Sequence, residues 1–354
     1  MADRPSPEEA LRLAKAVADL YSAGTAELVQ IVARQSVRGS AANARGKLAE
    51  LVRLRGAAQK LVAQVQAAGP AKAIRLVADA YGAGVARGSA GQAGPVTTSL
   101  VRTNESAVHY YARQLAGELD PLGPAMLRWA DDAYRQVIAD TAHLVVTGSL
   151  TQTQATARAV DRFAQLGVTT FVGRDGSRMR IESYAEMATR TTVQRAYLGG
   201  AIDAQLRSGR PLAIVAGGTG CPQCFPWVNQ VISLDGSSPN FPSLAEALTS
   251  GLFHPNCTHS IDPYREGGLI VPPPPPTAAQ VAANAEHARV LDRARALERA
   301  VRESHRRVAA AKVTGDPRLL ATQRHLLAVR QARLKEHVSR HGLKPYVSAR
   351  RSAA

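Results

Sequence analysis

The fold of the middle of this chain is decided by two stretches, Gly220-Cys221-Pro222-Gln223-Cys224 and Gly251-Leu252-Phe253-His254-Pro255-Asn256-Cys257-Thr258-His259-Ser260. Cysteine occurs nowhere else among the 354 residues. Together the stretches form a C-x2-C pair followed by an H-x2-C pair, with a second histidine two residues after the last cysteine. This clustering points to a shared task for these side chains.

The spacing predicts a zinc site. Structural zinc takes four Cys or His ligands in a tetrahedron, and ligands two residues apart can be presented by one tight turn. Cys221, Cys224, His254 and Cys257 supply four ligands, and His259 is the competing fourth ligand. Because protein side chains then fill every position, the predicted zinc is a structural ion rather than a catalytic one.

Two other interpretations of the cysteines stay open. They could be small core residues with two histidines near a turn, or Cys221 and Cys224 could form a disulfide. The N-terminus is polar and acidic and no apolar segment follows it, which predicts synthesis in a reducing cytoplasm and favours metal over disulfide. No stretch approaches the roughly 18 apolar residues of a membrane span, so we expect no membrane association.

The charge of the chain is concentrated at its ends. The net charge is +16. Residues 1–90 carry 13 basic and 7 acidic side chains, residues 91–276 carry 14 and 15, and residues 277–354 carry 17 and 6. Basic ends around a neutral middle suit contact with a polyanion or an acidic protein surface, although a solvated helix face would look the same.

Hydrophobic periodicity predicts a mainly helical chain with a few strands. Aromatic residues are scarce at 5%, whereas 45% of residues are apolar, which favours closely packed helices. Helical spacing is expected over 7–87, with a break at Gly24-Thr25 and a third helix around 74–81, and again over 105–166, 184–206 and 243–249. Alternation predicts a β-hairpin over 168–181 and strands at 211–216 and near Ile261.

These elements predict an α+β protein that is predominantly helical. Its expected parts are a helical N-terminal region (1–100), a central α+β domain with the β-hairpin and the Cys/His cluster (101–271), a stiff polyproline spacer (272–276) and a basic αα-hairpin tail (277–354) that the spacer projects. The turn of the tail is expected at Thr314-Gly315-Asp316-Pro317.

Between Val168 and Asp262 the order of motifs resembles the Mu-like minor head proteins of tailed bacteriophages and the minor capsid proteins of phages of Gram-positive hosts. The matching features are an aromatic–glycine hairpin at 171–178, a Y-x-E-M-x-x-R-T helix with Tyr184, Glu186, Arg190 and Thr191, and the C-x2-C … H-P-N-C-x-H ending. The chain departs from the family's pattern at Thr258, where arginine is common, and at 192–194, where an acidic residue is common.

The resemblance implies a structural virion protein rather than an enzyme. Such a protein is made in the host cytoplasm, lies inside the capsid near the portal, and acts in head morphogenesis, with DNA packaging or ejection as further roles. Its implied partners are the portal and other head proteins, and packaged DNA through the basic tail.

Two other functions stay open. A zinc-stapled nucleic-acid-binding protein would also carry basic ends. An ADP-ribosyltransferase-like toxin would need acidic and arginine side chains around a cleft, for which Glu182, Glu186 and Arg190 are the candidates. For Glu186 and Arg190, four residues apart on one helix, an ordinary ion pair is the simpler interpretation, and a buried Arg190 bonded to carbonyls near the hairpin is the other.

Overall fold

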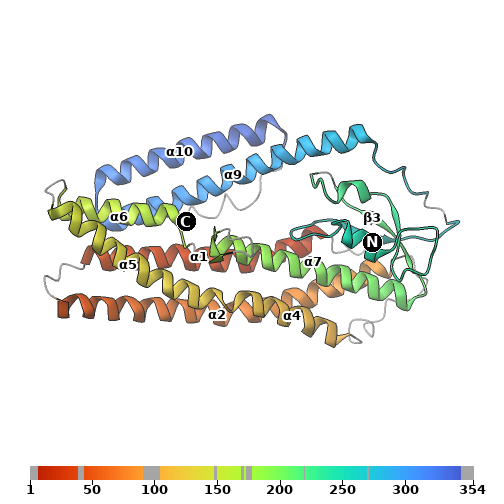
Figure 1. The fold of residues 1–354 in the computed structure, drawn as a ribbon, viewed down its shortest axis with the longest axis horizontal. Helices are drawn as coiled ribbons and strands as arrows, with labels where there is room; N and C mark the ends of the chain where they lie inside the picture. The colour runs from red at the N-terminus through yellow and green to blue at the C-terminus, as the bar shows by residue number, and fades with distance from the viewer. Residues whose placement is uncertain are drawn as a thin grey trace. The chain divides into compact units, whose positions relative to one another are not determined.

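The computed structural model describes residues 7–38, 44–90, 104–146, 150–168, 171–172, 178–218, 220–268 and 271–343 (Figure 1). It is mainly helical with small antiparallel sheets, which confirms the predicted fold class. Within these ranges no helix has both the length and the apolar character that a membrane crossing requires.

The chain divides into two compact units, each assembled from three separate segments. The first unit comprises Met1–Asp19, Ala68–Leu119 and Ala185–Arg289, and the second comprises Leu20–Ala67, Asp120–Tyr184 and Val290–Ala354. The linear division at residues 100, 271 and 276 stays a prediction about folding units, which limited proteolysis can test.

Two expected helix boundaries are wrong. Helix α1 (Pro7–Arg38) continues through Gly24, and helix α2 (Ala44–Gly88) joins the segments expected to be separate helices. A Cβ at Gly24 would lie 2.7 Å from Cγ2 of Val65. This glycine therefore permits close contact between α1 and α2 in the second unit, and tertiary packing overrides its helix-breaking tendency.

The second unit also contains α5 (Leu122–Val146), α6 (Gln152–Leu166) and the hairpin strands β1 (Phe171–Val172) and β2 (Arg178–Met179). Residues 173–177, which include the expected hairpin turn at 173–176, lie outside the described residues. Helices α9 (Ala278–Thr314) and α10 (Pro317–Arg340) form the predicted αα-hairpin (Figure 1). Asp316 caps α10 by accepting the backbone N–H groups of Arg318 and Leu319.

Buried ion pairs anchor the C-terminal hairpin in the second unit. Arg306 of α9 lies 3.1 Å from Glu182, and both side chains are almost fully buried. Arg307 makes two hydrogen bonds to Asp161 of α6, at 2.9 and 2.6 Å. The projection of the tail by the proline spacer stays a prediction, but Arg306 and Arg307 are partners of carboxylates in the second unit rather than free surface charges.

In the first unit, α7 (Ile181–Arg207) packs against the end of α2 and also against α4 (Glu105–Leu119), where Gly199 lies close to Tyr111. A Cβ at Gly84 or Gly88 would collide with backbone atoms of α7, at 1.9 Å from the carbonyl oxygen of Tyr197 and 2.3 Å from that of Ala201. Only glycine allows this approach. Arg87, beside Gly88, then pairs with Asp262 at 2.5 Å and ties α2 to the small sheet.

That sheet has the order β4-β3-β5 and is antiparallel throughout. Strand β3 (Leu212–Ala216) is central, with Ile214 opposite Val231 of β4 (Val231–Ser233) and Asp262 of β5 (Ser260–Pro263). Helix α8 (Leu244–Thr249) precedes β5 and begins with a capping box formed by Ser243 and Glu246. Strand β4 and the short 3₁₀ helix η1 (Phe225–Trp227) were not expected.

Candidate metal centre

The sheet brings the two cysteine stretches together. Cys221 and Cys224 lie in the connection from β3 to β4, just before η1, whereas His254 and Cys257 lie between α8 and β5. Because β4 and β5 both pair with β3, the two connections meet beside one sheet. The sulfur atoms of Cys224 and Cys257 lie in the hydrophobic cluster formed by α7, the sheet and α8.

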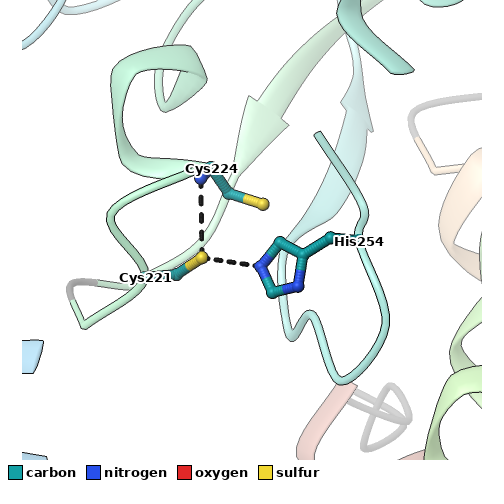
Figure 2. Close-up of side chains that lie close together, drawn as sticks. All are labelled: Cys221, Cys224 and His254. Atoms are coloured by element: carbon teal, nitrogen blue, oxygen red, sulfur yellow. Dashed lines mark hydrogen bonds between the residues drawn. The ribbon is translucent and has the colours of Figure 1, made fainter. Parts of the chain in front are cut away.

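The first group of possible ligands is Cys221, Cys224 and His254 (Figure 2). Sγ of Cys221 lies 2.8 Å from Nε2 of His254. The backbone N–H of Cys224 donates to the same sulfur at 3.5 Å, as expected of a tight turn that presents two cysteines to one ion. Cys221 and His254 are partly exposed, and Cys224 is buried.

The second group is Cys224, Cys257 and His259, all buried. Sγ of Cys224 lies 3.4 Å from Sγ of Cys257, which in turn lies 3.5 Å from Nδ1 of His259. Ligand atoms around a tetrahedral zinc ion with bonds of about 2.0–2.3 Å are separated by roughly 3.3–3.8 Å. The two groups share Cys224, and within each group the ligand atoms lie within 4.8 Å of one another.

Backbone carbonyls orient both histidines. Nδ1 of His254 lies 2.7 Å from the oxygen of Pro255, and Nε2 of His259 lies 3.1 Å from the oxygen of Gly218. A nitrogen that donates to a carbonyl leaves the other nitrogen as a lone-pair donor, and that nitrogen faces a cysteine sulfur in both residues. Metal-binding histidines are commonly held by such a second hydrogen bond.

The backbone just before His254 and Cys257 is constrained. Phe253 and Asn256 have positive φ values of 58° and 65°, and they immediately precede His254 and Cys257. Asparagine tolerates this region, but phenylalanine does so rarely and at a cost of about 1–3 kcal/mol. Such strain persists where the surrounding structure imposes it, and functional sites are common locations.

The cysteines are free thiols, so the interpretation of Cys221 and Cys224 as a disulfide is wrong for this structure. The hydrogen bond with Cys224, together with burial, raises the pKa of Cys221 to about 12. The hydrogen bond from Cys224 lowers the pKa of Cys257.

The chemistry of the donor set fits a metal, because thiolates and imidazoles are the ligands that zinc prefers and a bound ion would deprotonate every cysteine. This Cys/His group could hold a metal ion.

The motif residues of α7 have different environments. Tyr184 is buried, and Glu186 and Arg190 form the ion pair at 3.8 Å that the simpler interpretation predicts. Nε of Arg190 is buried without a hydrogen bond to any residue that the structure describes. The hydroxyl oxygen of Thr191 accepts the backbone N–H of Asn256 at 3.2 Å, in the loop that carries His254 and Cys257.

Three residues of the site carried no recognisable signal in the sequence. Gln194 donates to the backbone oxygen of His259 at 2.6 Å. A Cβ at Gly217 would lie 2.2 Å from Cδ2 of His259, so glycine is needed there for the ring to fit. The side-chain oxygen of Asn284 accepts the backbone N–H of Gly220 at 2.5 Å. None of these positions has the spacing of a ligand motif, and only their contacts identify them.

One of the two acidic candidates for an enzyme site, Glu182, forms an ion pair with an arginine of α9. Glu182 is buried, and one carboxylate oxygen is paired with Arg306.

The chain belongs to the family described as phage minor capsid protein 2, whose model matches residues 6–339. Neither a curated protein nor a solved structure matches it. Membership agrees with the resemblance found in the motifs around the cysteine cluster. The protein is therefore a structural protein of the phage head, and its family implies interaction with other head proteins.

Proposed function

We propose that this protein is a minor structural component inside the capsid of a tailed phage, near the portal, where it acts in head assembly and in DNA packaging or ejection without catalysing a reaction. The observation that carries the proposal is the family match over residues 6–339. The buried ion pair between Glu182 and Arg306 also supports a structural role, because this carboxylate already has a partner.

The test is co-purification with heads. Procapsids from infected cells, separated from free protein by sedimentation, are expected to contain the chain in few copies, together with the portal. In heads assembled without portal protein, incorporation is expected to be lost. A protein that sediments only as free chains would contradict the proposal.

The proposed cofactor is one structural zinc ion. Cys221, Cys224 and Cys257 would bind it through sulfur, with His254 or His259 as the fourth ligand. The ion would join the β3–β4 connection to the loop before β5, and a closed ligand set would leave no position for water or substrate. The chain's own contribution is to bring both loops to one side of the sheet and to hold both imidazole rings through backbone carbonyls.

The proposed contact with DNA uses the outward face of α10. Arg318, Arg324, Arg333 and Lys335 are exposed there, and none has an acidic partner among the described residues. At 100° per residue they form two rows beside a line of exposed small residues, Ala321, Ala328, Ala332 and Ser339. Because the side chains between the two rows of cations are small, both rows could come close to a phosphate backbone.

Salt-dependent binding to a DNA duplex tests this contact. Replacing the four cations by glutamine is expected to weaken binding and to reduce the slope of log affinity against log salt by about 3–4, since each phosphate contact contributes about 0.9. The matched control replaces Arg289, Arg295 and Arg340, which are already paired with acidic neighbours. An equal loss in both variants would contradict the assignment of this face.

The same exposed cations favour a second candidate function, a zinc-stapled nucleic-acid-binding protein that acts outside the virion. The two functions differ in location. A head protein is retained in purified particles after nuclease and salt washes, whereas a free nucleic-acid-binding protein is removed.

A further inference from the structure

Three polar side chains from helices hold the two loops of the candidate metal centre. Thr191 and Gln194 of α7 bond to the backbone of Asn256 and His259. Asn284 of α9 bonds to the backbone of Gly220. Each of these backbone groups belongs to a candidate ligand residue or to its direct neighbour. All three side chains therefore fix the backbone that orients the ligand side chains.

Asn284 is the least expected of the three. It lies beyond the proline run, on an alanine-rich turn of α9, and is only 3% exposed. Its Nδ2 is buried and has no hydrogen-bond partner among the described residues. A buried amide with one unsatisfied group is costly, and alanine would pack at this position without that cost. Its bond to Gly220 is the interaction that compensates for the burial.

The bond acts at a demanding point of the backbone. Gly220 has a φ of 106°, a conformation that residues with a side chain rarely adopt, and it immediately precedes Cys221. The turn that presents Cys221 and Cys224 therefore begins at Gly220. Asn284 satisfies the N–H of this residue and fixes the orientation in which the chain enters the turn.

We propose that Asn284 is a positioning residue of the metal centre, acting with Thr191 and Gln194, so that full metal affinity requires the start of α9 although α9 supplies no ligand. The inference rests on the proposed zinc site. It means that the start of α9, which follows the proline spacer and belongs to the first unit up to Arg289, takes part in the site.

The test measures zinc affinity in the full-length protein by competition with a chromophoric chelator, and the ligand field by cobalt(II) absorption. Asn284→Ala is expected to bind zinc about 10–100-fold more weakly, the usual effect of losing a partner that orients a ligand. Asn284→Asp keeps the acceptor oxygen and is expected to bind close to wild type. Glu286→Ala, an exposed change two residues further on, is the matched control and is expected to have no effect.

The outcomes separate this inference from the zinc site itself. Wild-type protein that binds no zinc overturns the site and the inference together. Wild-type protein that binds zinc while Asn284→Ala binds it equally well overturns only the inference. If circular dichroism shows that Asn284→Ala does not fold, Thr191→Val decides, because it removes the acceptor for Asn256 but keeps a branched side chain. Unchanged zinc affinity in Thr191→Val then overturns the proposal.

Discussion

Two regions of this protein bury polar groups in different ways. Around the small sheet, three cysteines and two histidines converge with their sulfur and nitrogen atoms facing one another. In the second unit, Arg306 and Arg307 of α9 meet the carboxylates of Glu182 and Asp161. The arginines and carboxylates form ion pairs with each other, whereas the cysteines and histidines form groups that could hold a metal ion. The first region should therefore depend on metal, and the second should not.

The largest effect that tests this difference is loss of a shared ligand. Cys224→Ser and Cys257→Ser are each expected to abolish zinc binding and to unfold residues 217–262, because structural zinc contributes on the order of 10 kcal/mol of apparent binding free energy to folding. Hydrogen exchange measured by mass spectrometry should show lost protection in β4 and β5.

The internal control is the ion-pair region of α9 and α10, which should keep its protection in both variants. Intact protection across residues 217–262 together with no bound zinc would show that the cysteines are ordinary core residues.

The next effect concerns the buried ion pair. Arg306→Met removes one partner and leaves Glu182 buried and charged, so it is expected to destabilise the fold by about 3–5 kcal/mol. The double variant Glu182→Leu with Arg306→Met should recover most of that loss, since neither charge remains. Urea unfolding measures both.

Arg295→Met is the matched control for the ion pair. Arg295 is paired with Asp292 on the exposed surface of the same helix, and little change is expected. Equal destabilisation by both single variants would mean that the position of Arg306 in the interior is unimportant.

A smaller effect tests the fit of His259. Gly217→Ala places a methyl group against the imidazole ring and is expected to cost about 1–3 kcal/mol and to weaken zinc binding. Gly218→Ala is the neighbouring control, because a Cβ there meets nothing within 4 Å. If both variants bind zinc as the wild type does, His259 does not need its observed position.

The smallest effect is a pH dependence in the ion-pair region. Burial lowers the pKa of His305, which lies beside Arg306 on α9, below the ordinary value of 6.5. Below pH 6.5 the unfolded chain binds a proton that the folded chain resists, so stability should fall as the pH falls from 6.5 toward the lowered pKa. His305→Gln should reduce this slope in urea titrations at pH 7.5 and 5.5, and an unchanged slope would exclude His305 as its source.

The sequence predicted features with short-range signals. The helix at 243–249, the turn at Thr314–Pro317 and the C-x2-C pair each follow from residues a few positions apart. Glycine disfavours helices, so the sequence predicts a break at Gly24. The close approach to Val65, forty-one residues away, is the reason for glycine there, and no local pattern indicates it.

The positioning residues had no such signals. Gln194 and Asn284 act on atoms more than sixty residues away, and nothing near them in the sequence marks them. The carboxylate partners of Arg306 and Arg307 lie at the start of α7 and in α6, more than a hundred residues away in the sequence. No local pattern therefore indicates that these arginines form ion pairs rather than lie free at the surface. Composition gives the number of charges, but only the fold determines which of them are buried.

The most direct test of the zinc account is the metal content and cobalt(II) spectrum of the full-length protein purified without added metal. We expect one zinc per chain and, after exchange, intense absorption typical of a tetrahedral cobalt site with sulfur ligands and no bound water. Protein that is fully folded, free of metal and unable to take up cobalt would contradict it.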